Sequence, residues 1–98
     1  MALLYIWEFS EIVSRHGTMI GKAPGIRQQT PLSIGGAPVQ SLPFTAGTSY
    51  IRMHCDAICS IDIGENPTAT TSKARMAANQ TEYMGVNPGD SLSVIANT

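Results

Sequence analysis

The stretch from Ser49 to Gly64 decides the fold and reads Ser-Tyr-Ile-Arg-Met-His-Cys-Asp-Ala-Ile-Cys-Ser-Ile-Asp-Ile-Gly. Its odd-numbered positions from Ile51 to Ile63 are all apolar, and its even-numbered positions are mostly polar, Ile58 being the one aliphatic exception. Successive side chains of a strand point to opposite faces, so this period of two predicts extended chain with one buried face. The stretch forms either one long bent strand or two strands joined near Asp56-Ala57.

Shorter segments with strand character surround this stretch. They are Leu3 to Phe9, Thr18 to Ile20, Gly25 to Ile34, Val39 to Phe44, Lys73 to Ala77, Thr81 to Val86 and a final strand around Leu92 to Ala96. Turn residues separate them at intervals of about 8–12 residues, most clearly at Asn87-Pro88-Gly89-Asp90. Residues 11–13 either extend the first strand or form one helical turn. The pattern predicts an all-β fold, a single-domain β-sandwich or jelly roll of about seven or eight short strands spanning residues 1–98.

The first predicted strand differs from the central stretch because both of its faces are apolar. Tyr5, Trp7 and Phe9 alternate with Leu4, Ile6 and Glu8. A strand of this kind is buried on both sides. Either a second molecule covers one face, or the strand slots between the two sheets of its own sandwich. Since aromatic residues are enriched where proteins meet, Tyr5, Trp7 and Phe9 are candidate partner-interface residues, and residues 1–12 are a candidate interacting strand or arm.

Composition limits the classes of partner. Only 13% of the residues are charged, against about 25% in ordinary soluble domains, and the net charge is −1. The six basic residues form no run, so the chain has no long-range field that would attract nucleic acid. The low charge is typical of a protein that packs against other proteins, although a small domain can also be weakly charged for no such reason.

The amino terminus indicates no targeting segment. Met-Ala-Leu-Leu-Tyr-Ile-Trp has no positive residue before its apolar part, and Glu8 cuts that part short. We therefore expect neither a signal peptide nor a membrane span, and synthesis in a cytosol-like compartment.

The two cysteines, Cys55 and Cys59, belong to the apolar face of the central stretch. In one straight strand they would lie roughly 13 Å apart, beyond the reach of a disulfide. A bridge would require the turn at Asp56-Ala57. We predict free, buried thiols that pack as small apolar groups.

No pattern of catalytic or metal-binding residues is evident. His54, Asp56 and Ser60 follow one another on the polar face of an extended strand and cannot converge on one reacting atom. The other histidine, His16, lies in a loop-like region. The sequence has no paired histidines, calcium loop or phosphate-binding loop, so we expect no enzyme activity, no metal and no cofactor.

The carboxy-terminal half nevertheless resembles a known class of proteins. The segments that carry the resemblance are Tyr50-Ile51-Arg52-Met53, Ile61-Asp62-Ile63-Gly64, Asn66-Pro67-Thr68-Ala69, Met76-Ala77-Ala78, Glu82-Tyr83-Met84-Gly85-Val86 and Pro88-Gly89-Asp90 followed by Leu92-Ser93-Val94-Ile95. They resemble small virion proteins of tailed bacteriophages, of the capsid decoration or cement type. The similarity covers roughly half of the chain and concerns turns and core positions.

The resemblance implies a protein made in the host bacterial cytoplasm that ends on the capsid exterior of the virion. It would bridge neighbouring copies of the major capsid protein and associate with itself as a homodimer or homotrimer. An alternative is an accessory module of a phage tail or baseplate. A small carbohydrate-binding or enzymatic β domain is a further alternative, and a carbohydrate binder would need its aromatic residues, which are scattered along the sequence, to form a platform.

Overall fold

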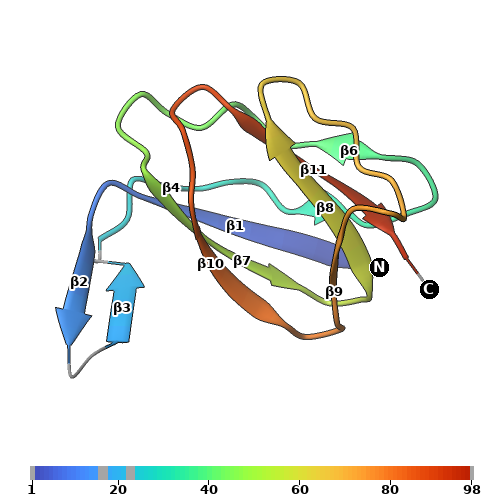
Figure 1. Ribbon diagram of the computed structural model, residues 1–98, viewed down its shortest axis with the longest axis horizontal. Helices are drawn as coiled ribbons and strands as arrows, with labels where there is room; N and C mark the ends of the chain where they lie inside the picture. Colours follow the sequence, from blue (N-terminus) through green and yellow to red (C-terminus); the bar gives the residue numbers. More distant parts are fainter. Residues whose placement is uncertain (1, 16–17, 22–23, 98) are drawn as a thin grey trace.

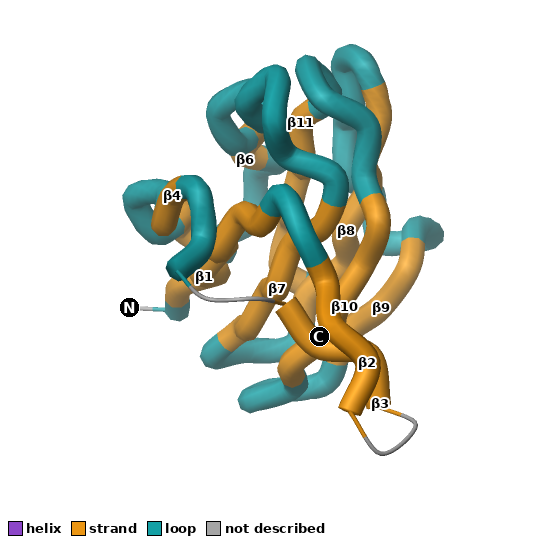
Figure 2. Tube along the Cα trace, turned by 90° about the vertical axis from the view of Figure 1, so that its left-hand side faces the viewer, coloured by secondary structure: helices purple, strands orange, loops and turns teal. Residues whose placement is uncertain are grey.

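The computed structural model describes residues 2–15, 18–21 and 24–97, with backbone alone for residues 12–15 and 18–21. Strands account for 46% of the chain, and the described residues contain no helix, as the tube view shows (Figure 2). The prediction of an all-β fold is therefore confirmed. Two antiparallel sheets form a small β-sandwich, whereas the jelly-roll variant stays a prediction.

The first sheet has the strand order β10-β7-β1-β4, with β5 also paired to β1. Its strands are β1 (Leu3–Phe9), β4 (Arg27–Gln28), β5 (Leu32–Ser33), β7 (Tyr50–Cys55) and β10 (Thr81–Gly85). The second sheet has the order β6-β11-β8-β9. Its strands are β6 (Val39–Gln40), β8 (Cys59–Gly64), β9 (Ala74–Met76) and β11 (Ser91–Ala96).

A separate hairpin stands beside the sandwich. It consists of β2 (Ile12–Arg15) and β3 (Thr18–Gly21), which pair only with each other among the described strands. Figure 1 shows it projecting beyond one end of the first sheet. The expected strand near Thr18 to Ile20 is therefore confirmed, and residues 12–15 form a strand of their own rather than a helical turn.

The hydrophobic core lies between the two sheets. Both sheets contribute aliphatic and sulfur-containing side chains: Leu4, Ile6, Ile51, Met53 and Cys55 from the first sheet, and Cys59, Ile61, Met76, Leu92 and Val94 from the second, joined by Phe44 from a loop. Most of these residues belong to the period-two pattern that predicted the strands. The alternation therefore identified the buried face correctly.

The central stretch of the sequence forms two strands rather than one. β7 ends at Cys55 and β8 begins at Cys59, and these strands belong to different sheets. Residues 56–58 therefore carry the chain from one sheet to the other. Both cysteines are free and buried, as predicted. The Cys55 thiol donates to the Ala77 carbonyl at 3.0 Å.

The expectation of a terminal arm needs correction for residues 3–9. β1 pairs with β7 along one edge and with β4 and β5 along the other, so it is an interior strand of the first sheet and is not slotted between the sheets. Leu4, Ile6 and Glu8 face the core. Both faces of β1 are apolar because its inner face joins the core and its outer face carries a cluster of aromatic residues.

Two other predicted strands are shorter than expected. The segment from Gly25 to Ile34 is interrupted around Pro31, which has no backbone N–H to donate, and only β4 and β5 remain. Gln29 points inward from this segment and is buried, whereas Ile26 is 41% exposed. In the segment from Val39 to Phe44, only β6 is a strand, and Leu42 is 58% exposed. Arg27 and Gln29 turn inward to bind Glu8, and Gln29 also bonds to the Leu42 backbone, which explains both departures.

Candidate functional site: an aromatic face on the first sheet

The outer face of the first sheet collects most of the aromatic residues of the chain. Five of the six lie on it: Tyr5, Trp7 and Phe9 on β1, Tyr50 on β7 and Tyr83 on β10. The sixth, Phe44, belongs to the core. We call these five residues the aromatic face. Three of them alternate along β1, and strand register brings the distant residues Tyr50 and Tyr83 onto the same face.

The register aligns these residues in rows across the sheet. Trp7 pairs with Arg52, which pairs with Tyr83. The neighbouring row on one side pairs Phe9 with Tyr50, and the row on the other side pairs Tyr5 with His54. Side chains directly opposite each other on one face of an antiparallel pair lie close enough to interact. Arg52 therefore stands between two aromatic neighbours in the middle of the face.

Ring contacts connect the members of the aromatic face. The ring centroids of Trp7 and Phe9 are 4.8 Å apart, those of Phe9 and Tyr50 are 6.4 Å apart, and those of Tyr50 and Tyr83 are 5.9 Å apart with nearly parallel planes. Aromatic pairs at such separations contribute about 0.5–1.5 kcal/mol each beyond their buried area. Burial, and then the nearby Tyr83, raises the pKa of Tyr50 above its usual value.

The three interface residues predicted from the sequence differ in accessibility. Tyr5 is 41% exposed, and Tyr83, which the sequence did not single out, is 44% exposed. Trp7 is half-buried, and Phe9 is only 3% exposed. Phe9 therefore supports Trp7 and Tyr50 from within the fold, whereas Tyr5, Trp7 and Tyr83 present surface to solvent.

A surface pocket of about 210 Å³ lies at the β1 side of this face. Side chains of Tyr5, Trp7, Gln28, Arg52 and His54 surround it. Such a combination of aromatic surface with a few polar groups is typical of ligand-binding sites, although this pocket is smaller than the roughly 300–1,000 Å³ of most of them.

Trp7 is held in place by the backbone of Gly25. A Cβ atom at residue 25 would collide with the indole nitrogen of Trp7 and would lie 2.8 Å from the Glu8 carbonyl oxygen. Only glycine permits this close approach. The amide of the next residue, Ile26, donates to that same Glu8 carbonyl at 2.7 Å.

The polar residues of the face have few partners of their own. The His54 Nδ1 lies 2.8 Å from the Thr81 hydroxyl, and its Nε2 is 4.0 Å from an Asp56 carboxylate oxygen. In the part of the chain that the structure describes, Arg52 has no hydrogen bond or ion pair from its guanidinium. Arg52 is therefore free to bind an acceptor on another molecule.

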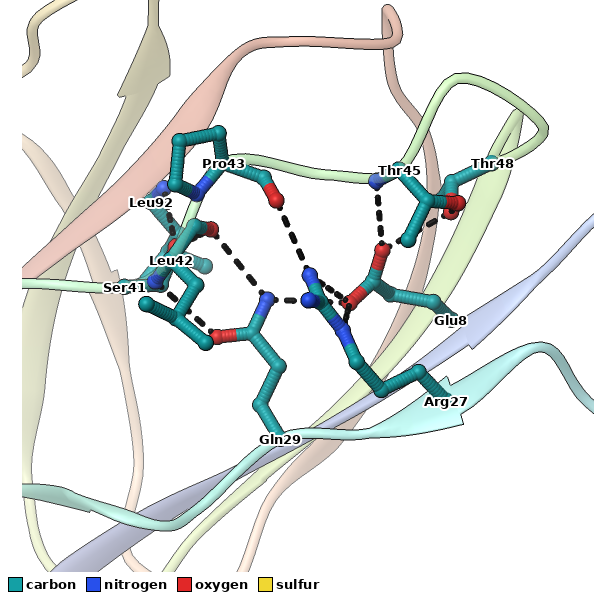
Figure 3. Close-up of polar contacts among 9 residues, drawn as sticks. All are labelled: Glu8, Arg27, Gln29, Ser41, Leu42, Pro43, Thr45, Thr48 and Leu92. Atoms are coloured by element: carbon teal, nitrogen blue, oxygen red, sulfur yellow. Dashed lines mark hydrogen bonds and ion pairs between the residues drawn. The ribbon is translucent and has the colours of Figure 1, made fainter.

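A fully buried carboxylate anchors the strand that carries Tyr5, Trp7 and Phe9. Glu8 is 0% exposed, and four residues donate to it, as Figure 3 shows. The donors are Arg27 at 2.6 Å, the Gln29 amide at 3.0 Å, the Thr45 backbone N–H at 3.0 Å and the Thr48 hydroxyl at 2.7 Å. Burial by itself raises the pKa of Glu8, but these hydrogen bonds outweigh it and leave the pKa below its usual value. Glu8 therefore stays ionised at neutral pH.

The donors to Glu8 are themselves fixed to the loop that follows β6. Arg27 also donates to the Pro43 carbonyl at 2.9 Å. Gln29 donates to the Leu42 carbonyl at 3.3 Å and accepts from the Leu42 amide at 3.1 Å (Figure 3). Since Gln29 must face inward to make these bonds, the neighbouring Ile26 and Leu42 side chains are left outside the core. Among the described residues, no buried side-chain polar atom lacks a partner.

The described residues form no constellation typical of catalysis. Ser60, which shares a sequence stretch with His54 and Asp56, lies on β8 in the second sheet, is buried and accepts from Asn97 at 2.7 Å. His54 and Asp56 are neighbours, but Ser60 is not brought to them. Within the described ranges no three metal-ligating side chains cluster. His16 lies outside the described residues. None of the described segments is a helix that could span a bilayer.

Comparison of the chain with protein-family models, with curated proteins and with solved structures found no match.

Proposed function

We propose that this chain is a bacteriophage capsid decoration protein, which uses the aromatic face to bind major capsid proteins and to hold neighbouring shell subunits together. The observation that carries the proposal is the concentration of exposed Tyr5, half-buried Trp7 and exposed Tyr83 around Arg52, whose guanidinium has no partner among the described side chains, on one sheet face. Tyr, Trp and Arg are the residues most enriched at the energetic centres of protein interfaces.

The rest of the chain agrees with a structural role. The low charge allows many copies to pack closely, and the resemblance of the carboxy-terminal half to phage head proteins supplies the capsid as the partner. The protein would act by binding alone, with no turnover of a substrate. Because it would bind only the assembled shell, each bound copy shifts the equilibrium towards assembly by mass action.

The experiment compares heads assembled with and without this chain in the virus that encodes it. Heads that carry it should survive heating or low salt longer, and electron cryomicroscopy should place it on the capsid exterior. Tyr5→Ser and Tyr83→Ser should each weaken binding to heads. Leu42→Ser is the matched control, because Leu42 is exposed but belongs to the loop after β6 and not to the first sheet. Localisation on the tail, or equal survival of heads lacking the chain, would refute the capsid role and favour the tail accessory module.

A second candidate function is carbohydrate binding, and one observation favours it specifically. The structure gathers the aromatic residues into a platform whose pocket is bordered by hydrogen-bonding side chains, namely Gln28, Arg52 and His54. Sugars stack on aromatic rings and bind such groups. Titration with bacterial surface polysaccharides, followed by the fluorescence of Trp7, tests it. Saturable quenching that Tyr5→Ser abolishes supports a carbohydrate site, and an unchanged spectrum at millimolar sugar refutes it.

A further inference from the structure

One edge of the first sheet is open. β10 pairs with β7 on one side, and no described strand pairs with its other side. Figure 1 shows β10 at the margin of the sandwich, and its five residues make it the longest of the edge strands. Unpaired strand edges offer rows of N–H and C=O groups that readily pair with another strand.

The hydrogen-bond pattern determines which groups of β10 are unpaired. Two backbone hydrogen bonds flank the strand: the Cys55 amide donates to the Gln80 carbonyl at 3.2 Å, and the Val86 amide donates to the Ser49 carbonyl at 3.0 Å. In an antiparallel pair, residues alternate between positions that bond to the neighbour and positions that point away. Glu82 and Met84 therefore bond to β7. The N–H and C=O groups of Thr81, Tyr83 and Gly85 point outward to the open edge.

Other edges of the sandwich carry features that discourage pairing. The edge made by β4 and β5 is interrupted at Pro31 and includes Arg27. β6 has only two residues and directly follows Pro38, and β9 contains Arg75. Proline and charged side chains at an edge, lysine above all, are the usual protection against edge-to-edge association. β10, with the sequence Thr-Glu-Tyr-Met-Gly, has no proline and no basic residue, and its one charged residue, Glu82, accepts a hydrogen bond from the Gln80 side chain of its own chain.

Apolar surface lies on the core side of the same edge. A groove of about 260 Å³ opens there between the two sheets, lined by the apolar residues Ile61, Ile63, Ala74 and Met84 together with the Asp62–Lys73 ion pair. Met84 is 38% exposed although its side chain faces inward from β10. On the outward face, the stack of Tyr50 on Tyr83 ends at this edge. At β10, therefore, apolar or aromatic side chains are exposed on both faces of the sheet.

We propose that two copies of this chain associate through β10, strand to strand and antiparallel, to form one continuous sheet across a two-fold axis at Tyr83. Because Tyr83 is an outward-bonding position, the Tyr83 residues of the two copies exchange both of their backbone hydrogen bonds at the axis. Thr81 of each copy then pairs with Gly85 of the other. A two-fold interface requires a self-complementary surface of this kind.

The same register extends the side-chain pattern. Tyr83 meets its counterpart directly across the axis, so the aromatic face continues from one copy to the next. Met84 of each copy lies opposite Glu82 of the other and is covered at the edge of the groove. The association needs no capsid protein, so it goes beyond the proposed function and is tested without it.

The first measurement is the mass of the purified chain by sedimentation equilibrium over a wide concentration range. A reversible monomer–dimer equilibrium is expected. Hydrogen exchange of the backbone amides on the same samples tests the register of the pairing. The amides of Thr81, Tyr83 and Gly85 should gain protection as the dimer forms. The amides of Glu82 and Met84 should be protected in the monomer as well. A chain that stays monomeric, or a dimer in which the three outward amides remain unprotected, overturns the proposal.

Variants then separate the edge from the aromatic face. Tyr83→Lys places like charges opposite each other at the axis and should weaken dimerisation at least tenfold. Tyr5→Lys is the matched control, because Tyr5 is equally exposed on the same face but lies on the interior strand β1. It should leave the dimer intact. Equal effects of the two variants would show that the copies meet face to face, which contradicts pairing through β10.

Discussion

Replacing Glu8 with glutamine removes one negative charge from the interior and leaves the shape of the side chain nearly unchanged. Its effect follows from the four donors that surround the carboxylate. Glutamine has one oxygen to accept their bonds, and its NH₂ group must face donors on the other side. Donor then opposes donor in a site with no exposure to water.

The magnitude can be worked from this geometry. Breaking a fully buried ion pair by removing one partner costs about 3–5 kcal/mol. The Arg27 side chain is 33% exposed, so water replaces part of the lost interaction. We therefore expect Glu8→Gln to lower the free energy of unfolding by about 2–3 kcal/mol at pH 7. For a domain of this size, that corresponds to a fall in Tm of about 10–20 °C.

The pH dependence provides an independent check. Because the pKa of Glu8 is lowered in the folded state, its ionised form stabilises the fold above the unfolded-state value of roughly 4.3. This contribution is lost as the pH falls through the lower, folded-state pKa. The wild-type protein should therefore lose stability at acid pH, and the difference between wild type and Glu8→Gln should shrink there.

Urea unfolding followed by the fluorescence of Trp7, the single tryptophan, measures both effects. Glu65→Gln is the control, since Glu65 is an exposed loop residue and the same substitution there should change stability by less than about 0.5 kcal/mol. If Glu8→Gln were as stable as wild type at pH 7, or if its deficit were constant down to pH 3, the charged carboxylate would not be what fixes β1 to the loop after β6.

Three further predictions concern the rest of the fold. Thiol reagents should label Cys55 and Cys59 only as fast as the protein unfolds, because both thiols are buried. Burial, together with the neighbouring Cys55, also raises the pKa of Cys59 to about 12. Rapid labelling of the native protein would contradict this prediction. Deleting residues 1–9 should abolish cooperative unfolding, since β1 is an interior strand, and a folded truncated chain would restore the arm hypothesis. Gly25→Ala should shift the fluorescence emission of Trp7 and lower the free energy of unfolding by about 1–3 kcal/mol, because the added methyl group overpacks the site. Gly36→Ala is the control: a Cβ atom there meets no other atom, so the emission spectrum of Trp7 should stay unchanged.

The period-two pattern was sufficient to predict the strands of the central stretch and their buried face, because successive side chains along a strand alternate between its two faces. Ile51, Met53 and Cys55 were assigned correctly for this reason. The alternation could not say which strands become neighbours. β1 was therefore expected as an arm or a slotted strand, although its pairing with β7 makes it an interior strand of its own sheet.

The aromatic face shows the same limit. Tyr5 and Tyr83 come from opposite ends of the chain, and only the register through Arg52 and His54 on β7 places them on one surface. The Glu8 site was also missed. Its donors Gln29 and Thr48 lie 21 and 40 residues away in sequence. A charged residue at an inward position of the first strand was the available signal, since buried charges require partners.

The interior position of β1 has a consequence for how the chain folds as it is synthesised. β1 leaves the ribosome before β7, which pairs along one of its edges and is separated from it in the chain by residues 10–49. Until β7 emerges, Tyr5, Trp7 and the core side of the strand remain exposed to other nascent chains. Contacts between residues so distant in sequence slow folding into the range of about milliseconds to seconds. The interval before β7 appears is therefore when this protein is most exposed to aggregation and most in need of a chaperone.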